Sequence, residues 1–260
     1  MYGPRRMRVT FLGTGTSTGV PVIGCRCRVC TSGDPRNRRL RPSILLEWDG
    51  RTILVDSSSD FRQQALLHRI DRLDAVLYTH GHADHVMGLD DLRIYNFRQR
   101  ADLPVYGSAG TLEDLKRTFW YAFTETQEGG GKPQLDLRPV AQPFELFGVR
   151  VEPIPLWHGN LEVFGYRIGR FAYCTDCNRV PPASLAALEG LDILIMDALR
   201  PTPHPTHFSL PESLALLSEL KPGVAYLVHM SHDIEHAQTE AALPPSIHLA
   251  YDGLVLETHR

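Results

Sequence analysis

Short apolar runs separated by polar or glycine-rich segments extend along the whole chain. Alternating or continuous apolar runs predict strands, and apolar positions at helical spacing predict helices. The predicted strands cover residues 7–12, 43–47, 51–55, 75–78, a stretch from 105, 135–140, 144–154, 163–168, 171–175, 193–196, 224–228 and 254–257. The predicted helices cover residues 61–68, 109–119, 183–188, 211–220 and 235–242. Because strands cluster before helices in each half, we expect two similar β-rich halves, each covered by helices, within one domain.

Turn and cap residues set the limits of several of these elements. Asp49-Gly50 is a strong turn pair and predicts a hairpin between the second and third strands. Asp60 and Ser209 stand where N-caps are expected for the helices that follow them. Residues 127–133 contain three successive glycines and predict a mobile loop.

Composition places the chain among ordinary soluble globular proteins, with 260 residues, 43% hydrophobic and 22% charged. This length allows one large domain, which we expect to span residues 1–260 with residues 1–6 as an N-terminal extension. The formal net charge is −3, whereas dedicated nucleic-acid binders usually carry a basic excess. Nucleic acid is therefore disfavoured as a partner, although a local basic groove stays open.

The sequence contains no segment that is typical of a membrane-spanning or an exported protein. No apolar run approaches the roughly 18–20 residues that a membrane-spanning helix needs. The start, Met1-Tyr2-Gly3-Pro4-Arg5-Arg6, is basic but lacks the apolar segment of a signal peptide. We therefore expect a cytoplasmic protein without a membrane partner.

The densest group of reactive side chains is His80-Gly81-His82-Ala83-Asp84-His85, which directly follows the apolar run 75–78. Imidazole nitrogens and carboxylate oxygens are the donors that borderline divalent metals bind. A loop at the carboxyl end of a buried strand is also where α/β folds carry their chemistry. Three histidines and an aspartate this close have no packing role, so the loop predicts a metal site rather than a polar surface turn.

Three further donors, His158, Asp176 and His229, follow later predicted strands. Each of them alone would be read as a satisfied polar residue or a cap. Their order after a His-x-His-x-Asp-His loop is far more specific, and it enlarges the donor group to the size that two metal ions require.

Together these donors resemble the full ligand set of the metallo-β-lactamase-fold hydrolases, namely His80, His82, Asp84, His85, His158, Asp176 and His229. The opening Phe11-Leu12-Gly13-Thr14-Gly15 resembles the phosphodiesterase branch of that superfamily, which includes ribonuclease Z. The resemblance covers nearly the whole chain. It implies a mixed α/β (α+β) fold, the four-layer αββα sandwich, in a single domain.

The same resemblance implies how the donors are shared. One ion would bind His80, His82 and His158, a second would bind Asp84, His85 and His229, and Asp176 would bridge them. Manganese, zinc or iron would suit these donors. A water or hydroxide between the ions would be the nucleophile near neutral pH and would attack phosphorus in line. The ions would neutralise charge on the phosphoryl oxygens, and Asp84 would also orient the nucleophile.

Three of the five cysteines crowd into Cys25-Arg26-Cys27-Arg28-Val29-Cys30, a spacing that suits metal better than a disulfide framework. A structural zinc site closes with a fourth donor, which His232 can supply three residues after His229. Three reduced cysteines in a loop would be the alternative, but such thiols oxidise readily. The combination resembles the PhnP-like cyclic phosphodiesterases, in which Cys25, Cys27, Cys30 and His232 would hold one structural zinc beside the catalytic strand end.

His207 is the candidate for a proton donor. The PhnP-like branch has a histidine at this position that acts as general acid toward the leaving oxygen, a task that suits a pKa near neutrality. The alternative reading of His207 is a polar residue before a helix cap, and His204 is a second, weaker candidate.

The sequence therefore predicts a dinuclear metal-dependent phosphodiesterase, with Asp84 and His207 as catalytic residues, that hydrolyses a small phosphodiester such as a ribose cyclic phosphate. Three alternatives stay open: a ribonuclease Z-like tRNA 3′-processing endonuclease, a thioester or lactone hydrolase on the same fold, and a metal-binding protein without turnover. Residues 120–133 are too short and not basic enough for a tRNA-gripping arm. Relatives commonly dimerise, so a homodimer is also allowed.

Some neighbouring residues have two readings. Asp56 would orient a metal-binding histidine or cap a strand end. Cys174 and Cys177 would form a redox pair, or Cys174 would pack beside the site while Cys177 approaches the metals. The arginines of residues 36–41 would contact phosphate or form a solvated charged run.

The segment after the histidine loop has a similar ambiguity. Asp90, Asp91 and Arg93 would either shape the site or cap and pair on the helix that follows.

Overall fold

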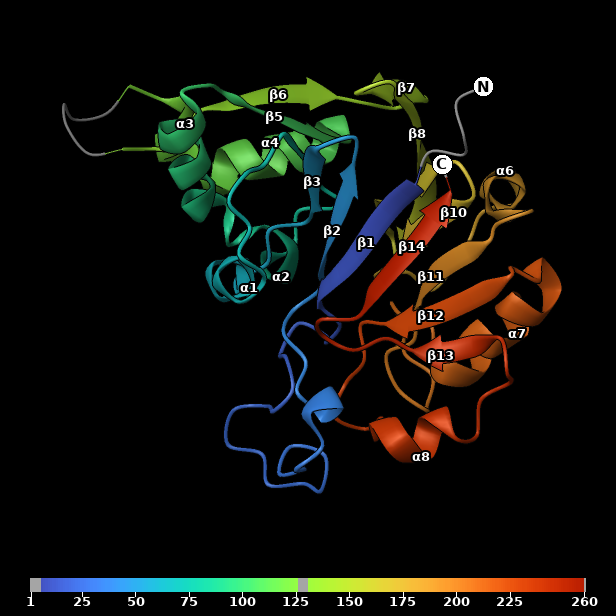
Figure 1. The fold of residues 1–260 in the computed structure, drawn as a ribbon. Helices are drawn as coiled ribbons and strands as arrows, with labels where there is room; N and C mark the ends of the chain where they lie inside the picture. Colours follow the sequence, from blue (N-terminus) through green and yellow to red (C-terminus); the bar gives the residue numbers. More distant parts are fainter. Residues whose placement is uncertain (1–5, 126–130, 260) are drawn as a thin grey trace.

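The computed structural model describes residues 6–125 and 131–259, which form two seven-stranded sheets packed face to face (Figure 1). The first sheet contains, in spatial order, β14 (Val255–His259), β1 (Arg6–Gly13), β2 (Ser43–Trp48), β3 (Arg51–Val55), β4 (Ala75–Leu77), β5 (Leu103–Gly107) and β6 (Leu135–Pro139). The second contains β13 (Ile247–Leu249), β12 (Val224–Val228), β11 (Ile193–Asp197), β10 (Phe171–Cys174), β9 (Leu161–Ile168), β8 (Val149–His158) and β7 (Phe144–Leu146).

Helices cover the outer faces of both sheets. On the first sheet these are α1 (Phe61–His68), α2 (Ala83–Val86), η2 (Leu89–Leu92), α3 (Arg93–Gln99), α4 (Ala109–Thr118) and α5 (Trp120–Phe123). On the second sheet these are α6 (Pro182–Leu185), η3 (Ala186–Leu188), α7 (Leu210–Leu220) and α8 (His236–Glu240). The short helix η1 (Pro35–Asn37) belongs to the N-terminal loop. The result is the four-layer αββα sandwich that the sequence predicted. Within the described residues, none of these helices is both long and apolar enough to span a membrane.

Side-chain alternation along the strands explains the layers. In β3, Ile53 and Val55 point into the core between the sheets, whereas Leu54 points toward the helices. The second sheet supplies Tyr166 and Tyr173 to the same central core. Because successive side chains of a strand face opposite ways, strands buried on both faces must be apolar throughout.

Parallel strands bring the predicted donor loops to one edge of the sandwich. β3, β4, β5 and β6 run parallel, as do β10, β11, β12 and β13. Two hydrogen bonds join the sheets at this edge. Phe164 N donates to Thr79 O at 2.9 Å, and the Tyr166 hydroxyl donates to Tyr78 O at 2.7 Å. The carboxyl ends of strands from both sheets therefore meet, as in other α/β sites.

The structure corrects several predicted boundaries. Residues 144–154 form a hairpin rather than one strand, because Phe147 and Gly148 adopt left-handed backbone angles (φ 50° and 75°). Asp60 does not cap α1 with its side chain; its carboxylate accepts hydrogen bonds from the backbone and the guanidinium of Arg41. The helix expected after the histidine loop, whose bounds were not predicted, is α3, and β13 was not predicted.

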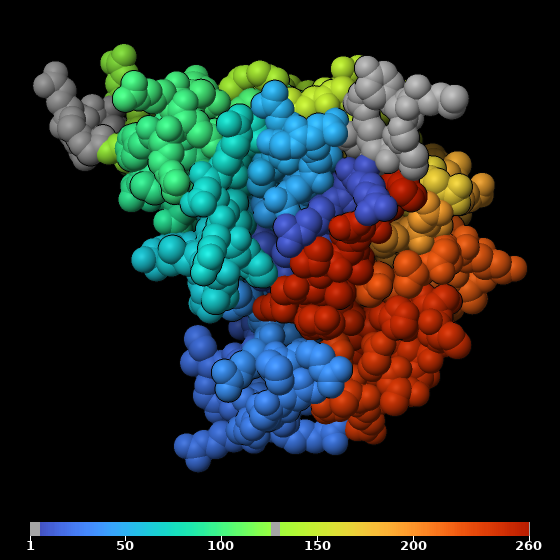
Figure 2. Space-filling model, viewed as in Figure 1, coloured from blue at the N-terminus to red at the C-terminus, as the bar shows by residue number. Residues whose placement is uncertain are grey.

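Two predicted segments lie largely outside the described residues. Of the predicted extension, residues 1–6, only Arg6 is described, and it begins β1. Of the predicted loop, residues 127–133, only residues 131–133 are described. The described loop-rich segment 14–42 lies against the C-terminal part of the chain (Figure 2), where the Arg28 guanidinium donates to the Gln238 side chain.

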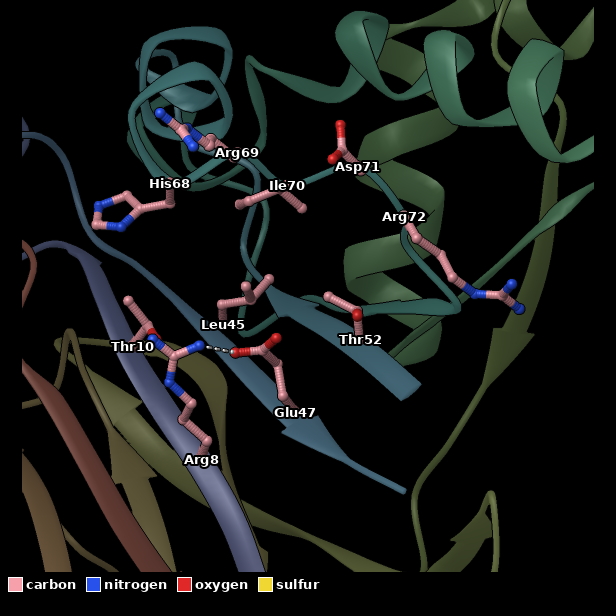
Figure 3. A pocket seen from close by; sticks show the side chains of 10 residues that line it. All are labelled: Arg8, Thr10, Leu45, Glu47, Thr52, His68, Arg69, Ile70, Asp71 and Arg72. Carbon is pink, nitrogen blue, oxygen red and sulfur yellow. Dashed lines mark hydrogen bonds and ion pairs between the residues drawn. The ribbon is translucent and has the colours of Figure 1, made fainter. Parts of the chain in front are cut away.

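A hollow of about 200 Å³ on the outer face of the first sheet is unrelated to the donor loops (Figure 3). It adjoins Thr52 at the start of β3, whereas the donor loops lie beyond the other end of that strand. Two of its arginines are already paired, since Arg8 meets Glu47 at 3.0 Å and Arg72 meets Asp74 at 2.6 Å.

Candidate metal centre and active site

The histidine loop leaves β4 and enters the short helix α2. His80 and His82 precede the helix, and Asp84 and His85 lie in its single turn. His80, Asp84 and His85 are buried, while His82 is exposed. The turn thus divides four neighbouring donors between two directions.

The structure brings all seven predicted active-site donors together in two groups. The ligand atoms of His80, His82 and His158 all lie within 4.8 Å of one another. The same limit holds for a second group, which consists of Asp84, His85, Asp176 and His229. The partition of the donors agrees with the one implied by the resemblance.

Asp176 lies between the two groups. Its Oδ1 is 3.2 Å from His85 Nε2, and its Oδ2 is 3.2 Å from His229 Nε2. The same Oδ2 is 3.8 Å from Nε2 of His80, which belongs to the first group. A carboxylate in this position can bridge two cations.

Unpaired buried nitrogens test whether cations fit here. Nε2 of His80 and Nε2 of His85 are buried and make no hydrogen bond to any described residue. Buried polar atoms are rarely left without a partner. Divalent ions bound by imidazole and carboxylate donors would satisfy these atoms, so the residues present fit such ions.

Hydrogen bonds hold the rings with Nε2 toward the centre. Nδ1 of His85 donates to Asp56 Oδ2 at 2.7 Å, and Asp56 also accepts from the backbone and hydroxyl of Thr79. Nδ1 of His158 donates to Thr206 O at 2.7 Å. This arrangement is the usual way in which proteins fix the tautomer of a metal-binding histidine. Asp56 therefore orients a donor histidine, one of its two predicted roles.

Burial and neighbouring charges shift the pKa values of residues in the second donor group. Burial opposes ionisation of Asp84 and Asp176, yet the imidazoles of His85 and His229 hold the pKa of both carboxyls below their usual range. Burial disfavours a charged His85, but Asp176, Asp84 and Asp56 raise its pKa. The centre thus favours carboxylates with positive charge beside them.

Three donor-loop residues adopt left-handed backbone angles: Asp56 (φ 61°), Asp176 (φ 52°) and His229 (φ 61°). This region is uncommon for residues other than glycine and is strained for a bulky side chain. Each residue follows a strand end, so the chain turns sharply there and aims the side chain across the edge of the sandwich.

The glycine-containing segment at the end of β1 supports the loop that carries His229. Thr14 O accepts from Met230 N at 3.1 Å, and Thr16 N donates to Met230 O at 3.2 Å. A Cβ on Gly13 would lie 2.0 Å from Arg41 O, so only glycine allows this close approach.

His207 joins the centre from the loop before α7. Its Nδ1 lies 2.9 Å from Asp197 Oδ2, and its ligand atom lies within 4.8 Å of those of His158 and Asp176. Burial lowers the pKa of His207, with Asp176 and Asp84 opposing that effect. Asp197, which is fully buried at the end of β11, had no predicted role; its position at a strand end was the only signal in the sequence.

The predicted cysteine site is also assembled. His232 Nδ1 lies 3.3, 3.7 and 3.4 Å from the sulfur atoms of Cys25, Cys27 and Cys30. Usual zinc–sulfur and zinc–nitrogen bond lengths in a tetrahedron give a separation of about 3.6 Å. Burial raises the pKa of Cys30 to about 11, whereas the Cys30 backbone N–H lowers that of Cys27 to about 6. The residues fit one zinc ion.

Three of the four arginines in residues 36–41 have partners within the chain. Arg36 pairs with Asp34, and buried Arg39 donates to the backbone carbonyls of Ser231 and Ile234. Arg41 pairs with Asp60, whereas Arg38 is exposed. These partners favour a structural role for Arg36, Arg39 and Arg41 over phosphate binding.

Cys174 and Cys177 pack in the apolar core beneath the helices of the second sheet, and neither belongs to a donor group among the described residues. The expected approach of Cys177 to the metals is therefore wrong. Asp90 accepts from the Tyr121 hydroxyl at 2.7 Å and pairs with Arg93 at 3.0 Å, which supports the helix-pairing reading.

A hollow of about 530 Å³ opens beside the first donor group. Its lining includes His82, Arg117 and Leu161. Arg117 pairs with Asp114 at this rim. His82 is the active-site donor that borders this hollow.

Comparisons with known proteins agree with this geometry. The family described as beta-lactamase superfamily domain matches residues 51–230. A crystal structure of a diphosphatase from the PhnP family is 46% identical, covers 97% of each chain and has a TM-score of 0.92. The expected PhnP-like resemblance is confirmed.

Two curated relatives carry different names. A protein of Porphyromonas gingivalis (strain ATCC BAA-308 / W83) named octanoyltransferase is 40% identical over 253 residues, which are 95% of this chain and 51% of the relative. This chain therefore spans about half the length of that relative. Coenzyme PQQ synthesis protein B of Methylobacterium radiotolerans is 30% identical over 226 residues, which are 74% of this chain and 72% of the relative.

Proposed function

The chain belongs to the beta-lactamase superfamily, and we propose that it is a dinuclear metal-dependent phosphodiesterase acting on a small, cyclic ribose phosphodiester. The position of Asp176 between two donor groups is the observation that carries this function. Paired cations a few ångströms apart are typical of enzymes that hydrolyse phosphate esters.

The proposed active-site ions would be manganese or zinc, or iron. When bound, two divalent ions would supply positive charge for the phosphoryl oxygens and lower the pKa of a water to near neutrality. Asp84, at the inner end of the donor loop, would orient that water through its carboxylate. Asp56 would keep His85 in the required orientation throughout.

His207 would complete the reaction as general acid. A ribose alkoxide is a poor leaving group, so proton donation from Nε2 to the departing oxygen would contribute about 10²–10⁴-fold to the rate. The hydrogen bond from Nδ1 to Asp197 leaves Nε2 of His207 available for this transfer.

The zinc proposed for Cys25, Cys27, Cys30 and His232 has a structural role. His232 follows His229 by three residues, so a closed zinc site would anchor the loop that presents a donor of the active centre. Arg39 supports the same loop through its bonds to Ser231 and Ile234.

Hydrolysis of a diphosphate is the second candidate. The 46%-identical PhnP-family structure is that of a diphosphatase, and a phosphoanhydride also needs charge neutralisation at phosphorus. Its phosphate leaving group depends less on a general acid than an alkoxide does. The buried His207–Asp197 pair therefore favours the phosphodiester.

A substrate panel tests the function. Manganese-loaded protein, with zinc in the cysteine site, would be assayed on 5-phosphoribosyl 1,2-cyclic phosphate, 2′,3′-cyclic nucleotides, a dinucleotide with a diphosphate bridge, a precursor tRNA, a thioester and a lactone. We expect selective turnover of a cyclic phosphate that Asp84→Ala abolishes. Asp90→Ala is the matched control, because Asp90 lies near the loop but pairs with Arg93.

The other outcomes each favour a different reading. Turnover of the diphosphate alone would favour the second candidate, and cleavage of the tRNA alone a processing nuclease. Turnover of only the thioester or the lactone would favour a thioester or lactone hydrolase over a phosphodiesterase. Silence on all substrates, with metals shown to be bound, would favour a metal-binding protein without turnover.

A further inference from the structure

We infer that Asp197 is a positioning residue whose one carboxylate holds both His207 and His229. The inference about His229 is independent of the activity, whereas the catalytic consequence for His207 rests on the proposed function. Neither the sequence motifs nor the proposed donor set assigns Asp197 a role.

Strand register places Asp197 beside the donor loops. β11 and β12 are parallel, and Asp197 is the register partner of Val228, the residue before His229. Ala198 N donates to Val228 O at 3.0 Å, and the hydroxyl of Ser213 in α7 donates to Asp197 O. The backbone of Asp197 is thus fixed from two sides.

One carboxylate oxygen is already engaged. Oδ2 of Asp197 accepts from His207 Nδ1 at 2.9 Å and from the backbone N–H of Cys177, also at 2.9 Å. Asp197 is fully buried, so this oxygen is held in a region from which water is excluded. His207 cannot turn without leaving a buried acceptor short of a donor.

The other carboxylate oxygen of Asp197, Oδ1, faces Nδ1 of His229. Oδ1 of Asp197 and Nδ1 of His229 are both buried and lack a hydrogen-bond partner among the described residues. They lie 3.9 Å apart. A small rotation of either side chain makes a hydrogen bond and satisfies both atoms, and buried polar atoms are rarely left unsatisfied.

The two rings are arranged for a shared acceptor. His207 and His229 stack with ring centroids 4.7 Å apart and planes inclined by 14°. His229 belongs to the second donor group and its Nε2 faces Asp176 at 3.2 Å, so a bound cation would take Nε2 and leave the proton on Nδ1, where it can donate a hydrogen bond to Asp197. The carboxylate therefore holds the Nδ1–H of both rings, with both Nε2 atoms directed at the centre. His207 would act as general acid in its imidazolium form, which carries a second proton on Nε2.

Two substrates with different leaving groups distinguish a positioning role of Asp197 from general structural support. Thymidine 5′-methyl phosphate needs a proton on its leaving methoxide, whereas the 4-nitrophenolate of thymidine 5′-(4-nitrophenyl) phosphate leaves without one. We expect Asp197→Asn to lower kcat about 100-fold on the methyl ester and less than about 10-fold on the nitrophenyl ester. His207→Ala should show the same difference. Adding Asp197→Asn to His207→Ala should lower the rate further only by the small factor, less than about 10-fold, that Asp197→Asn causes on the nitrophenyl ester, because only the support of His229 is then lost.

Asp56→Asn is the matched control, because Asp56 is an equally buried carboxylate that orients only His85. It should lower both rates by similar factors. Equal losses on the two substrates for Asp197→Asn, or additive losses in the double variant, would overturn the catalytic part of the inference.

NMR tests the inference even if the protein hydrolyses neither ester. Absence of hydrolysis would count against the proposed function and not against the positioning role of Asp197. In zinc-loaded protein with ¹⁵N-labelled histidine, NMR should find His207 as the Nδ1–H tautomer and a slowly exchanging Nδ1 proton on His229. Asp197→Asn should remove both signatures, and Asp56→Asn should keep them. An Nε2–H tautomer of His207 in the unsubstituted protein, which needs no variant to fold, would overturn the inference.

Discussion

The Asp56 carboxylate accepts from His85 Nδ1 at 2.7 Å, and both side chains are fully buried. Asp56→Asn replaces the acceptor with an amide that can present a donor to the ring. We expect the affinity of the second donor group for zinc to fall about 10–100-fold, because partners of metal-binding histidines typically contribute that much. Titration against a chromophoric chelator measures the change.

Asp74→Asn is the control for that measurement. Asp74 is also a buried carboxylate, but it pairs with Arg51 and Arg72 away from the donor groups. Its loss should reduce stability and leave zinc affinity unchanged. Equal loss of zinc affinity in both variants would show that Asp56 has no special relation to the centre.

His232→Ala should remove one zinc ion per chain. The remaining three cysteine thiols cannot close a four-coordinate site, so the stabilisation from metal binding is lost. Elemental analysis after dialysis and the unfolding midpoint measure both effects. His248→Ala is the control, because His248 pairs with Glu240 outside the donor groups of the described residues. Unchanged zinc content in His232→Ala would refute the fourth ligand.

The cap of α7 offers a test of local stability. The backbone N–H of Ser209 donates to Glu212 Oε2 at 2.8 Å, and the Ser209 hydroxyl reaches the same carboxylate. Ser209→Ala should cost about 1 kcal/mol of unfolding free energy. Ser218→Ala, at an exposed position of the same helix, should be neutral or slightly stabilising. Denaturant titration that finds equal effects would contradict this role of Ser209.

His236 should make stability depend on pH. Burial, followed by the charges of Arg36 and Arg39, lowers its pKa from 6.5 to about 4. Between these values the unfolded chain binds the proton and the folded chain does not, so stability falls as pH decreases from 6.5 to 4. The loss is roughly 2 kcal/mol, less than the full shift implies, because nearby water screens part of the interaction.

His236→Gln should remove this part of the pH dependence. Unfolding free energies of both proteins, measured with metals saturating at each pH, should differ by an amount that changes between pH 6.5 and 4. Two parallel curves would contradict the assignment.

The donor loops were predictable because their signals are local. An apolar strand followed by a polar donor is visible within a few residues, as with His80 after β4 and His229 after β12. Gathering these strand ends at one edge follows from parallel pairing. The fold could likewise be predicted from the order of apolar runs and from the resemblance.

Other features depend on contacts between distant residues. Arg39 looks like part of a charged run, yet its guanidinium donates to the carbonyls of Ser231 and Ile234, far along the chain. Asp197 becomes informative only when His207 and His229 lie beside it. The hairpin at Phe147-Gly148 was missed because the apolar pattern continues across the turn.

Hydrolysis of a ribose cyclic phosphate in ¹⁸O-labelled water, followed by ³¹P NMR, shows whether water attacks phosphorus at this centre. Attack of water at phosphorus predicts one ¹⁸O on the product phosphate, seen as an isotope shift, and no product with Asp84→Ala. Product that carries the label on the ribose carbon, or equal turnover by Asp84→Ala, would contradict metal-dependent phosphodiester hydrolysis at this centre.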